Sequence, residues 1–192
     1  MKRVIFVGIC IFLIIFFIII NLYYGSKRNE KATLHGSDII SKPVNKNMKI
    51  TSSAFTNKQQ IPEKYTCKGA NINPPLEFLD VPENTKSLAL IVDDPDAPMG
   101  TWVHWVVINM EPRTLGIEEN SKPTSGTEGI TSFGKPHYGG PCPPSGTHRY
   151  FFKLYALDTK LGLTATADKK AVETQMQGHI LDQAEIIGIF SK

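Results

Sequence analysis

Two short stretches of this sequence combine histidines and acidic or sulfur-containing side chains with several prolines and glycines. The first, DDPDAPMGTWVHW, covers residues 93–105, and the second, YGGPCPPSGTHRY, covers residues 138–150. Proline restricts its own backbone and that of the preceding residue, so we expect both stretches to form stiff turns that aim their side chains. A histidine exchanges protons near neutral pH. Two rigid turns that each carry a histidine are typical of a small preorganised pocket.

The elements that must position these turns are predicted to be mainly β-strands. Runs rich in β-branched or aromatic residues, bounded by Pro, Gly, Asn or Asp, cover residues 48–55, 76–81, 87–92, 102–110 and 149–157. Within residues 102–110, regular alternation places His104 on one face together with Trp102, Val106 and Ile108. The proline-rich segment 111–147 is a long connection, and such a loop is usually functional or carries structure of its own.

The C-terminal segment changes from a period of two to a helical period. Val172, Met176, Ile180 and Ala184 are spaced four residues apart, which predicts a helix over residues 168–184. Thr166 is a suitable N-cap for this helix, and a last strand is expected at residues 185–190. The apolar stripe is interpreted as a core contact with the sheet.

The N-terminus is apolar enough for a membrane segment. Residues 4–20 contain neither a charge nor a proline, and about 20 such residues span a bilayer as a helix. A cleaved signal peptide is the alternative, but the residues that follow match a cleavage site poorly. We therefore expect a transmembrane signal anchor over residues 1–25, a flexible tether over residues 26–47 and one β domain over residues 48–192. Positively charged residues are nearly equal in number on the two sides of the apolar segment, so they do not fix its orientation in the membrane. The expected localisation is a single-pass membrane protein with an extracytoplasmic domain.

Charge and cysteine content narrow the classes of partner. The 192-residue chain has a formal net charge of only +3 and no basic stripe, which argues against nucleic-acid binding. Cys67 and Cys142 lie within the expected domain. They can pair in an exported domain, whereas in a reducing compartment they would remain free thiols.

Three motifs carry a resemblance to a known family. DPDAP followed by WVHW, then GGPCPPSGTHRYFFKLYALD, and a closing helix reading GHILDQAEIIGIF, resemble the phosphatidylethanolamine-binding protein family, in particular its bacterial Raf-kinase-inhibitor-like branch. The likeness covers residues 48–192 and leaves out the N-terminal segment. It implies a mainly β fold, a β sandwich in which a large antiparallel sheet packs on a smaller sheet, with a C-terminal helix. It also implies an anion pocket at one end.

Matching the motifs position by position implies a set of ligand-binding residues: Asp94, Asp96, Pro98, His104, Gly140, Pro143, Pro144, His148 and Tyr150. Our hypothesis is that Asp94 accepts a hydrogen bond from an imidazole, so that His104 or His148 presents an N–H donor to the anion. Backbone N–H groups near Gly140 and the hydroxyl of Tyr150 would add further donors. Arg149 is expected to point away from the pocket.

The predicted function is non-catalytic binding of a small anion, namely phosphate, a phospholipid headgroup or a phosphorylated ligand, with a regulatory or inhibitory effect on an unidentified protein partner. We expect no catalytic residue, no cofactor and no metal ion. The alternative is a hydrolase of phosphoesters or peptides, in which Asp94, Asp96, His104, His137 and His148 hold a metal ion or Ser145 acts with a histidine. A third hypothesis makes the loop of residues 111–134 a docking surface. Kinase inhibition is not transferred on resemblance alone, because this chain is short between DPDAP and its histidine strand.

Overall fold

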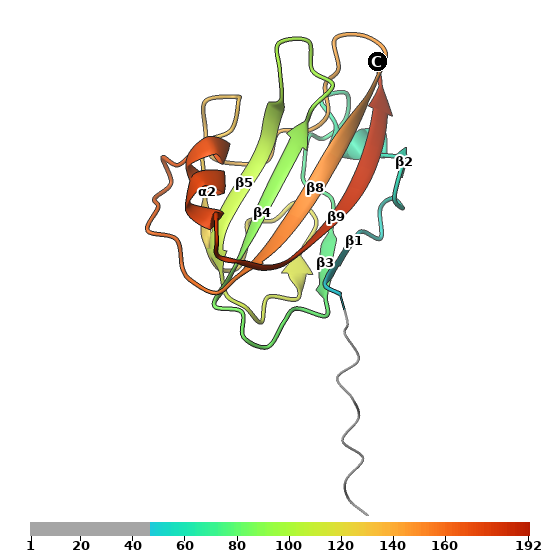
Figure 1. The fold of residues 1–192 in the computed structure, drawn as a ribbon. Helices are drawn as coiled ribbons and strands as arrows, with labels where there is room; N and C mark the ends of the chain where they lie inside the picture. Colours follow the sequence, from blue (N-terminus) through green and yellow to red (C-terminus); the bar gives the residue numbers. More distant parts are fainter. Residues whose placement is uncertain (1–46) are drawn as a thin grey trace, which may run out of the picture. The chain divides into compact units, whose positions relative to one another are not determined.

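The computed structural model describes residues 47–192, which form two β-sheets packed face to face and one helix (Figure 1). The smaller sheet has the order β1 (Lys49–Thr51), β3 (Leu76–Leu79) and β6 (Gly116–Ile117). The larger sheet has the order β2 (Gln59–Gln60), β9 (Ile180–Ser191), β8 (Thr147–Leu157), β4 (Ser87–Asp94), β5 (Trp102–Met110) and β7 (Thr127–Glu128). Every pairing is antiparallel except that of β2 with β9. The predicted fold class is confirmed.

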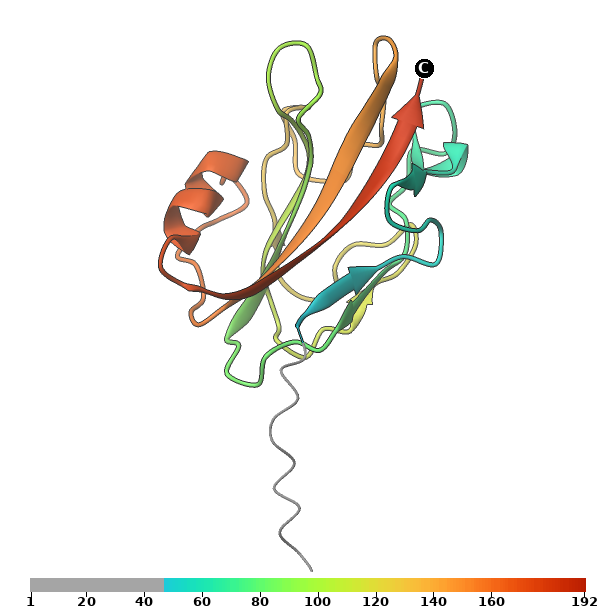
Figure 2. The ribbon, with the colours of Figure 1, turned by 45° about the vertical axis from the view of Figure 1, so that its right-hand side comes forward.

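The central strand β4 is buried along its whole length, because both faces of the large sheet are covered. Leu88, Leu90 and Val92 face the core between the two sheets. Ala89 and Ile91 face the opposite side, where they pack with residues of the helix α2 (Lys169–Met176). Figure 2 shows α2 on one side of the large sheet and the small sheet on the other. A strand covered on both faces reads as a continuous apolar run, as residues 87–92 do.

The helix is shorter than predicted. It begins after Asp168, whose carboxylate accepts the N–H of Ala171 at 2.8 Å, so Asp168 is the N-cap and the prediction of Thr166 is wrong. It ends at Met176, and Gly178 follows with a φ of +79°, a backbone conformation that favours glycine. The predicted helical residues 180–184 belong instead to β9, which pairs with β8 along its length. Continuous pairing over twelve residues outweighs the helical spacing of Ile180 and Ala184.

Strand β5 contains a β-bulge at its histidine. Val92 pairs with Trp105 and Asp93 pairs with Val103, so His104 is the extra residue between two pairs. Beyond it, Trp105 faces the core between the sheets, whereas Val106 faces the helix. The expectation that His104 shares a face with Val106 and Ile108 is therefore wrong. The bulge turns the imidazole towards Tyr150, at 5.2 Å between ring centroids.

The long connection from residue 111 to residue 147 carries structure of its own, as expected, including β6 and β7. The Glu119 carboxylate accepts the hydroxyl of Tyr65 at 2.6 Å, and Asn73 donates to the carbonyl of Glu118 at 2.8 Å. These bonds attach the loop to the preceding η1 turn (Glu63–Tyr65) and its neighbours. Whether the segment 111–134 docks a partner stays a prediction.

Membrane attachment requires a correction. Among residues 47–192, no helix has the length and apolar character that a membrane crossing requires. The prediction of a single-pass membrane protein with an extracytoplasmic domain therefore receives no support from the described part of the chain. The anchor expected over residues 1–25 and nearly all of the tether expected over residues 26–47 lie outside the described residues.

One of the two alternatives for the cysteines is confirmed. Cys67 and Cys142 form a disulfide, with their Cα atoms 5.4 Å apart and a sequence separation of 75 residues. The N–H of Cys67 also donates to the carbonyl of Pro141 at 3.1 Å. The disulfide thus ties the second proline-rich stretch to the segment that follows η1.

Removing the disulfide should lower the stability of the domain. In the chain-entropy account, a crosslink between residues this far apart in sequence restricts the unfolded chain and contributes about 2–5 kcal/mol. We expect the double variant Cys67→Ser, Cys142→Ser to unfold at a lower urea concentration than the wild type, by about that free energy. A reductant should lower the wild-type midpoint and leave that of the variant unchanged. Equal midpoints for the two oxidised proteins would contradict the crosslink.

The cap of α2 can be tested separately. Asp168→Ala removes the acceptor for the N–H of Ala171 and should lower the free energy of unfolding by about 1 kcal/mol. Asp168→Asn, which keeps an N-capping oxygen, is the matched control and should stay within a few tenths of a kcal/mol of the wild type. Chemical denaturation of the three proteins measures both differences. A loss of stability as large for Asn as for Ala would show that the charge, not the cap, matters.

Candidate functional site

A cavity of about 530 Å³ lies between the turn that joins β4 to β5 and the loop that precedes β8. Both connections lie at the same end of the large sheet (Figure 1). Five residues of the predicted ligand set line the cavity: Asp94, Pro98, His104, Pro144 and His148. The two stretches singled out by sequence therefore meet in space, although more than forty positions separate their histidines.

The cavity is organised around a buried pair of Asp94 and His148. Asp94 is the last residue of β4, and its Oδ2 lies 2.7 Å from Nδ1 of His148, with both side chains less than a tenth exposed. Its Oδ1 accepts the N–H of Asp96 at 2.8 Å. Because a carboxylate only accepts, Nδ1 of His148 carries the proton, and Nε2 is the ring nitrogen left for a ligand. Asp94 thus holds an imidazole as hypothesised, and that imidazole is His148.

The neighbouring Asp93 has a different environment because successive residues of a strand face opposite sides. Its carboxylate accepts two hydrogen bonds from Nζ of Lys153, at 2.8 and 2.9 Å, and Nζ of Lys169 lies 3.7 Å away. Asp93 is therefore neutralised on the helix side of the sheet. Only Asp94 of this pair presents its charge to the cavity.

His104 is held in one tautomer by the backbone. Its Nδ1 donates to the carbonyl of Gly139 at 2.6 Å, and the residue is only 3 % exposed. The rings of Tyr150 and Phe133 contact the imidazole edge-on. Burial lowers the pKa of His104, more than the nearby carbonyls and carboxylates raise it. The ring is therefore neutral near pH 7, and Nε2 offers a lone pair, not the N–H donor that we expected of this residue.

Tyr150 lies behind His104 and not in the cavity wall. Its side chain is 1 % exposed, and within residues 47–192 its hydroxyl oxygen has no hydrogen-bond partner. Burial and the negative charge of Asp94 raise the pKa of Tyr150, so the hydroxyl keeps its proton. A buried hydroxyl without a partner loses free energy.

Gly140 and Pro143 do not line the cavity. The N–H of Gly140 donates to Oδ1 of Asn71 at 2.7 Å, so it is not the anion donor that was expected. A Cβ at Gly140 would overlap the carbonyl oxygen of Tyr65, which explains the glycine by close packing of two loops and not by contact with a ligand. Pro143 is buried beside Cys142 in the same loop.

Asp96 also has another role than the one predicted. Its carboxylate accepts two hydrogen bonds from the guanidinium of Arg149, at 2.8 and 2.7 Å, and a third from the Arg149 N–H at 3.0 Å. The guanidinium hydrogen bonds lower the pKa of Asp96 to about 2. The pair joins the β4–β5 turn to the start of β8. Arg149 is absent from the cavity wall, in line with the expectation that it points away.

The remaining part of the wall is apolar and was not predicted: Ala97, Met99, Trp102, Phe133 and Cys142. Met99 is 95 % exposed, and Trp102 and Phe133 pack edge to face at 5.4 Å between ring centroids. Strand alternation placed Trp102 on the same face as His104, but Trp102 was not included in the expected ligand set. No sequence signal marks Phe133, because it comes from the long connection between β5 and β8.

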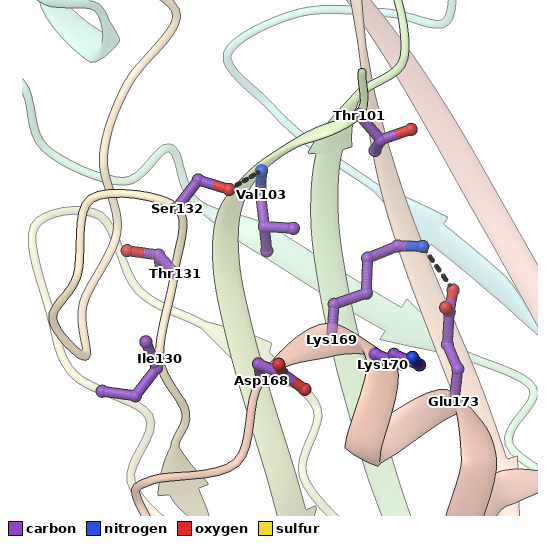
Figure 3. A pocket seen from close by; sticks show the side chains of 9 residues that line it. All are labelled: Thr101, Val103, Ile130, Thr131, Ser132, Asp168, Lys169, Lys170 and Glu173. Carbon is purple, nitrogen blue, oxygen red and sulfur yellow. Dashed lines mark hydrogen bonds and ion pairs between the residues drawn. The ribbon is translucent and has the colours of Figure 1, made fainter. Parts of the chain in front are cut away.

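A second cavity, of about 440 Å³, lies at the N-terminus of α2 (Figure 3). Three of its four charged side chains already have partners: Nζ of Lys169 lies 2.6 Å from the Glu173 carboxylate, and Asp168 caps the helix. Ser132 accepts the N–H of Val103 at 2.9 Å. The better candidate is the first cavity, where two buried histidines each use Nδ1 in the protein and keep Nε2 for a ligand.

Comparison with known proteins identifies the family. The sequence model of phosphatidylethanolamine-binding proteins matches residues 51–191. A UPF0098 protein of Methanothermobacter thermautotrophicus is 48 % identical over 150 residues, which are 76 % of this chain and 99 % of the relative. A UPF0098 protein of Aquifex aeolicus is 48 % identical over 152 residues, 76 % of this chain and 89 % of the relative.

Two solved structures share the fold. The phosphatidylethanolamine-binding protein homologue CT736 of Chlamydia trachomatis has a TM-score of 0.73 and 41 % identity, over 76 % of this chain and 98 % of that chain. YbcL of E. coli, described as a member of the mammalian family, has a TM-score of 0.72 and 30 % identity, over 77 % and 99 %. The chain belongs to the phosphatidylethanolamine-binding protein family.

Proposed function

We propose that the chain binds a small phosphate-type anion in the cavity between the β4–β5 turn and the loop before β8, without chemical turnover. Family membership supports a binding function in general. The anion could be inorganic phosphate, a headgroup or a phosphorylated ligand, since all three share the phosphate group. One observation carries the proposal: the Asp94–His148 pair at the cavity wall.

This pair has the charge arrangement that an anion site needs. When His148 is protonated, Nδ1–H remains with Asp94 and Nε2–H is directed away from that carboxylate, as the second donor of the ring. A charged donor to an anion forms a short and strong hydrogen bond. The negative charge of Asp94 balances the imidazolium, so the buried site carries no net positive charge of its own before the ligand binds.

The walls of the cavity are preorganised. The disulfide and the Gly140–Asn71 hydrogen bond hold the loop before β8, and the Asp96–Arg149 pair holds the β4–β5 turn. Pro98 and Pro144 further restrict the two backbones. Groups fixed before binding lose little entropy when the ligand arrives. Rigid walls on both sides favour binding over a cycle that needs a closing lid.

The hydrolase alternative lacks a prepared nucleophile in the described part of the chain. Ser145 is exposed, and within residues 47–192 no hydrogen bond joins its hydroxyl to an imidazole. A serine needs such a base to attack an ester. Of the carboxylates considered for a metal site, Asp96 is already neutralised by Arg149. These observations support binding without turnover.

The variant His148→Asn tests the anion site. An asparagine amide can keep a donor near the position of Nδ1, and so preserve the bond to Asp94, while it removes the Nε2 donor. Because a hydrogen bond to a charged group contributes about 1.5–3 kcal/mol, we expect the affinity for inorganic phosphate to fall by about tenfold or more. Isothermal titration calorimetry measures the affinity, and thermal unfolding confirms that the variant is folded.

The chain offers a matched control. His179 has the same geometry, with Nδ1 2.7 Å from Oδ1 of Asp158, but both side chains are exposed and outside the cavity. His179→Asn should leave phosphate affinity unchanged. Equal affinity of the His148→Asn variant and the wild type would contradict the proposed site. Saturable hydrolysis of a phosphate monoester that is lost in His148→Asn would contradict binding without turnover.

A further inference from the structure

The polar wall of the cavity contains two groups that can only accept a hydrogen bond from a ligand. The carboxylate of Asp94 accepts one hydrogen bond from the protein at each oxygen, which leaves a further lone pair on each. The ring of His104 is the second acceptor, because its Nδ1–H is used by the carbonyl of Gly139. A ligand that carries only acceptors would place its oxygens against these lone pairs.

The neutral state of His104 follows from its surroundings. The carboxylates of Asp94 and, from the other side of the sheet, Asp93 act on it from β4, and the ring of Tyr150 on β8 contacts it. The two carboxylates attract a proton, but burial opposes a charged ring more strongly, and the pKa of His104 is lowered. Above that pKa the ring carries the single proton that the Gly139 carbonyl holds at Nδ1.

We propose that the cavity selects a phosphate group that carries a proton, meaning the singly charged form of inorganic phosphate or of a phosphate monoester. Its P–O–H group donates to Nε2 of His104 or to Asp94, while another of its oxygens accepts from Nε2 of His148. This inference rests on the proposed function, since it specifies the ionic form of the same ligand. Anions of similar size that carry no proton near pH 7, such as sulfate and phosphate diesters, should therefore bind weakly.

The wild-type protein tests this inference directly. Calorimetric titrations at about pH 6 with inorganic phosphate, sulfate and dimethyl phosphate compare anions that differ in the P–O–H donor. The loss of one hydrogen bond to an acceptor in the cavity wall should weaken binding by about tenfold or more. We therefore expect sulfate and dimethyl phosphate to bind about tenfold more weakly than phosphate, or worse. Equal affinities for the three anions would overturn the inference.

The dependence on pH provides a second readout. The second pKa of a phosphate monoester is about 6, so its singly protonated form disappears as the pH rises through that value. The ratio of phosphate affinity to sulfate affinity should fall over the same pH range. We use the ratio because any titration of the protein that affects both affinities equally cancels in it. With alkyl phosphonates and fluorinated phosphonates, whose second pKa values differ, the midpoint should follow the ligand. A midpoint common to all ligands would contradict the proposal.

A variant can exchange the acceptor for a donor. In His104→Gln, the side-chain amide can turn its N–H₂ group towards the ligand, and the preference for phosphate over sulfate should shrink by several-fold. His179→Gln, at the exposed histidine outside the cavity, should retain the wild-type preference. If His104→Gln does not fold, nitrogen-15 NMR of the wild-type imidazoles serves instead. A single proton on Nδ1 of His104 in the phosphate complex supports the proposal, and a doubly protonated ring overturns it.

The two proposals fail in different ways. If phosphate does not bind at any pH, the proposed function is wrong, and the question of its ionic form does not arise. If phosphate binds and His148→Asn weakens it, but sulfate binds equally well, the anion site stands and only the selection of the protonated form is wrong.

Discussion

The hydrogen bond between Asp94 and His148 connects the two halves of the candidate site. Asp94 ends the central strand β4, and His148 is the second residue of β8, which pairs with β4 in the large sheet. The bond is largely buried, and breaking it would leave the carboxylate without its charged or polar partner at a site with little exposure to solvent. The turn before β5 and the loop before β8 must therefore stay together for this charge to remain compensated. The cavity is the space that these two segments enclose.

The second constraint is the bulge in β5. A regular strand would place His104 on the same face as Val106, against the helix. The extra residue reverses the alternation once, so that Trp102 and His104 face the cavity while Trp105 and Val107 still face the core between the sheets. Bulges next to binding sites commonly redirect one side chain in this manner. A polar ring thus stands at the edge of an apolar core without interrupting its packing.

The sequence was most informative where local chemistry and burial agree. The apolar run of residues 87–92 forms the buried strand that was predicted, and five of the nine ligand residues implied by the family resemblance line the cavity. It was least informative where a distant partner decides the role of a residue. Asp96 was taken for a ligand because nothing in its own segment shows that Arg149 neutralises it. Residues 180–184 have helical spacing, and only the long pairing partner β8 makes them a strand.

The same dependence on distant partners explains why the polarity of the site could not be predicted. Gly140 and His104 were both expected to donate to an anion, but Asn71 takes the N–H of the first and the Gly139 carbonyl takes the N–H of the second. Each structural hydrogen bond that fixes the cavity wall consumes a donor. Three groups remain available at the cavity: a carboxylate, a ring nitrogen with a lone pair, and one imidazole that can donate from Nε2. A wall that is rich in hydrogen-bond acceptors is complementary to an anion that carries a proton. The wall has this character because most of the nearby donors form hydrogen bonds within the protein.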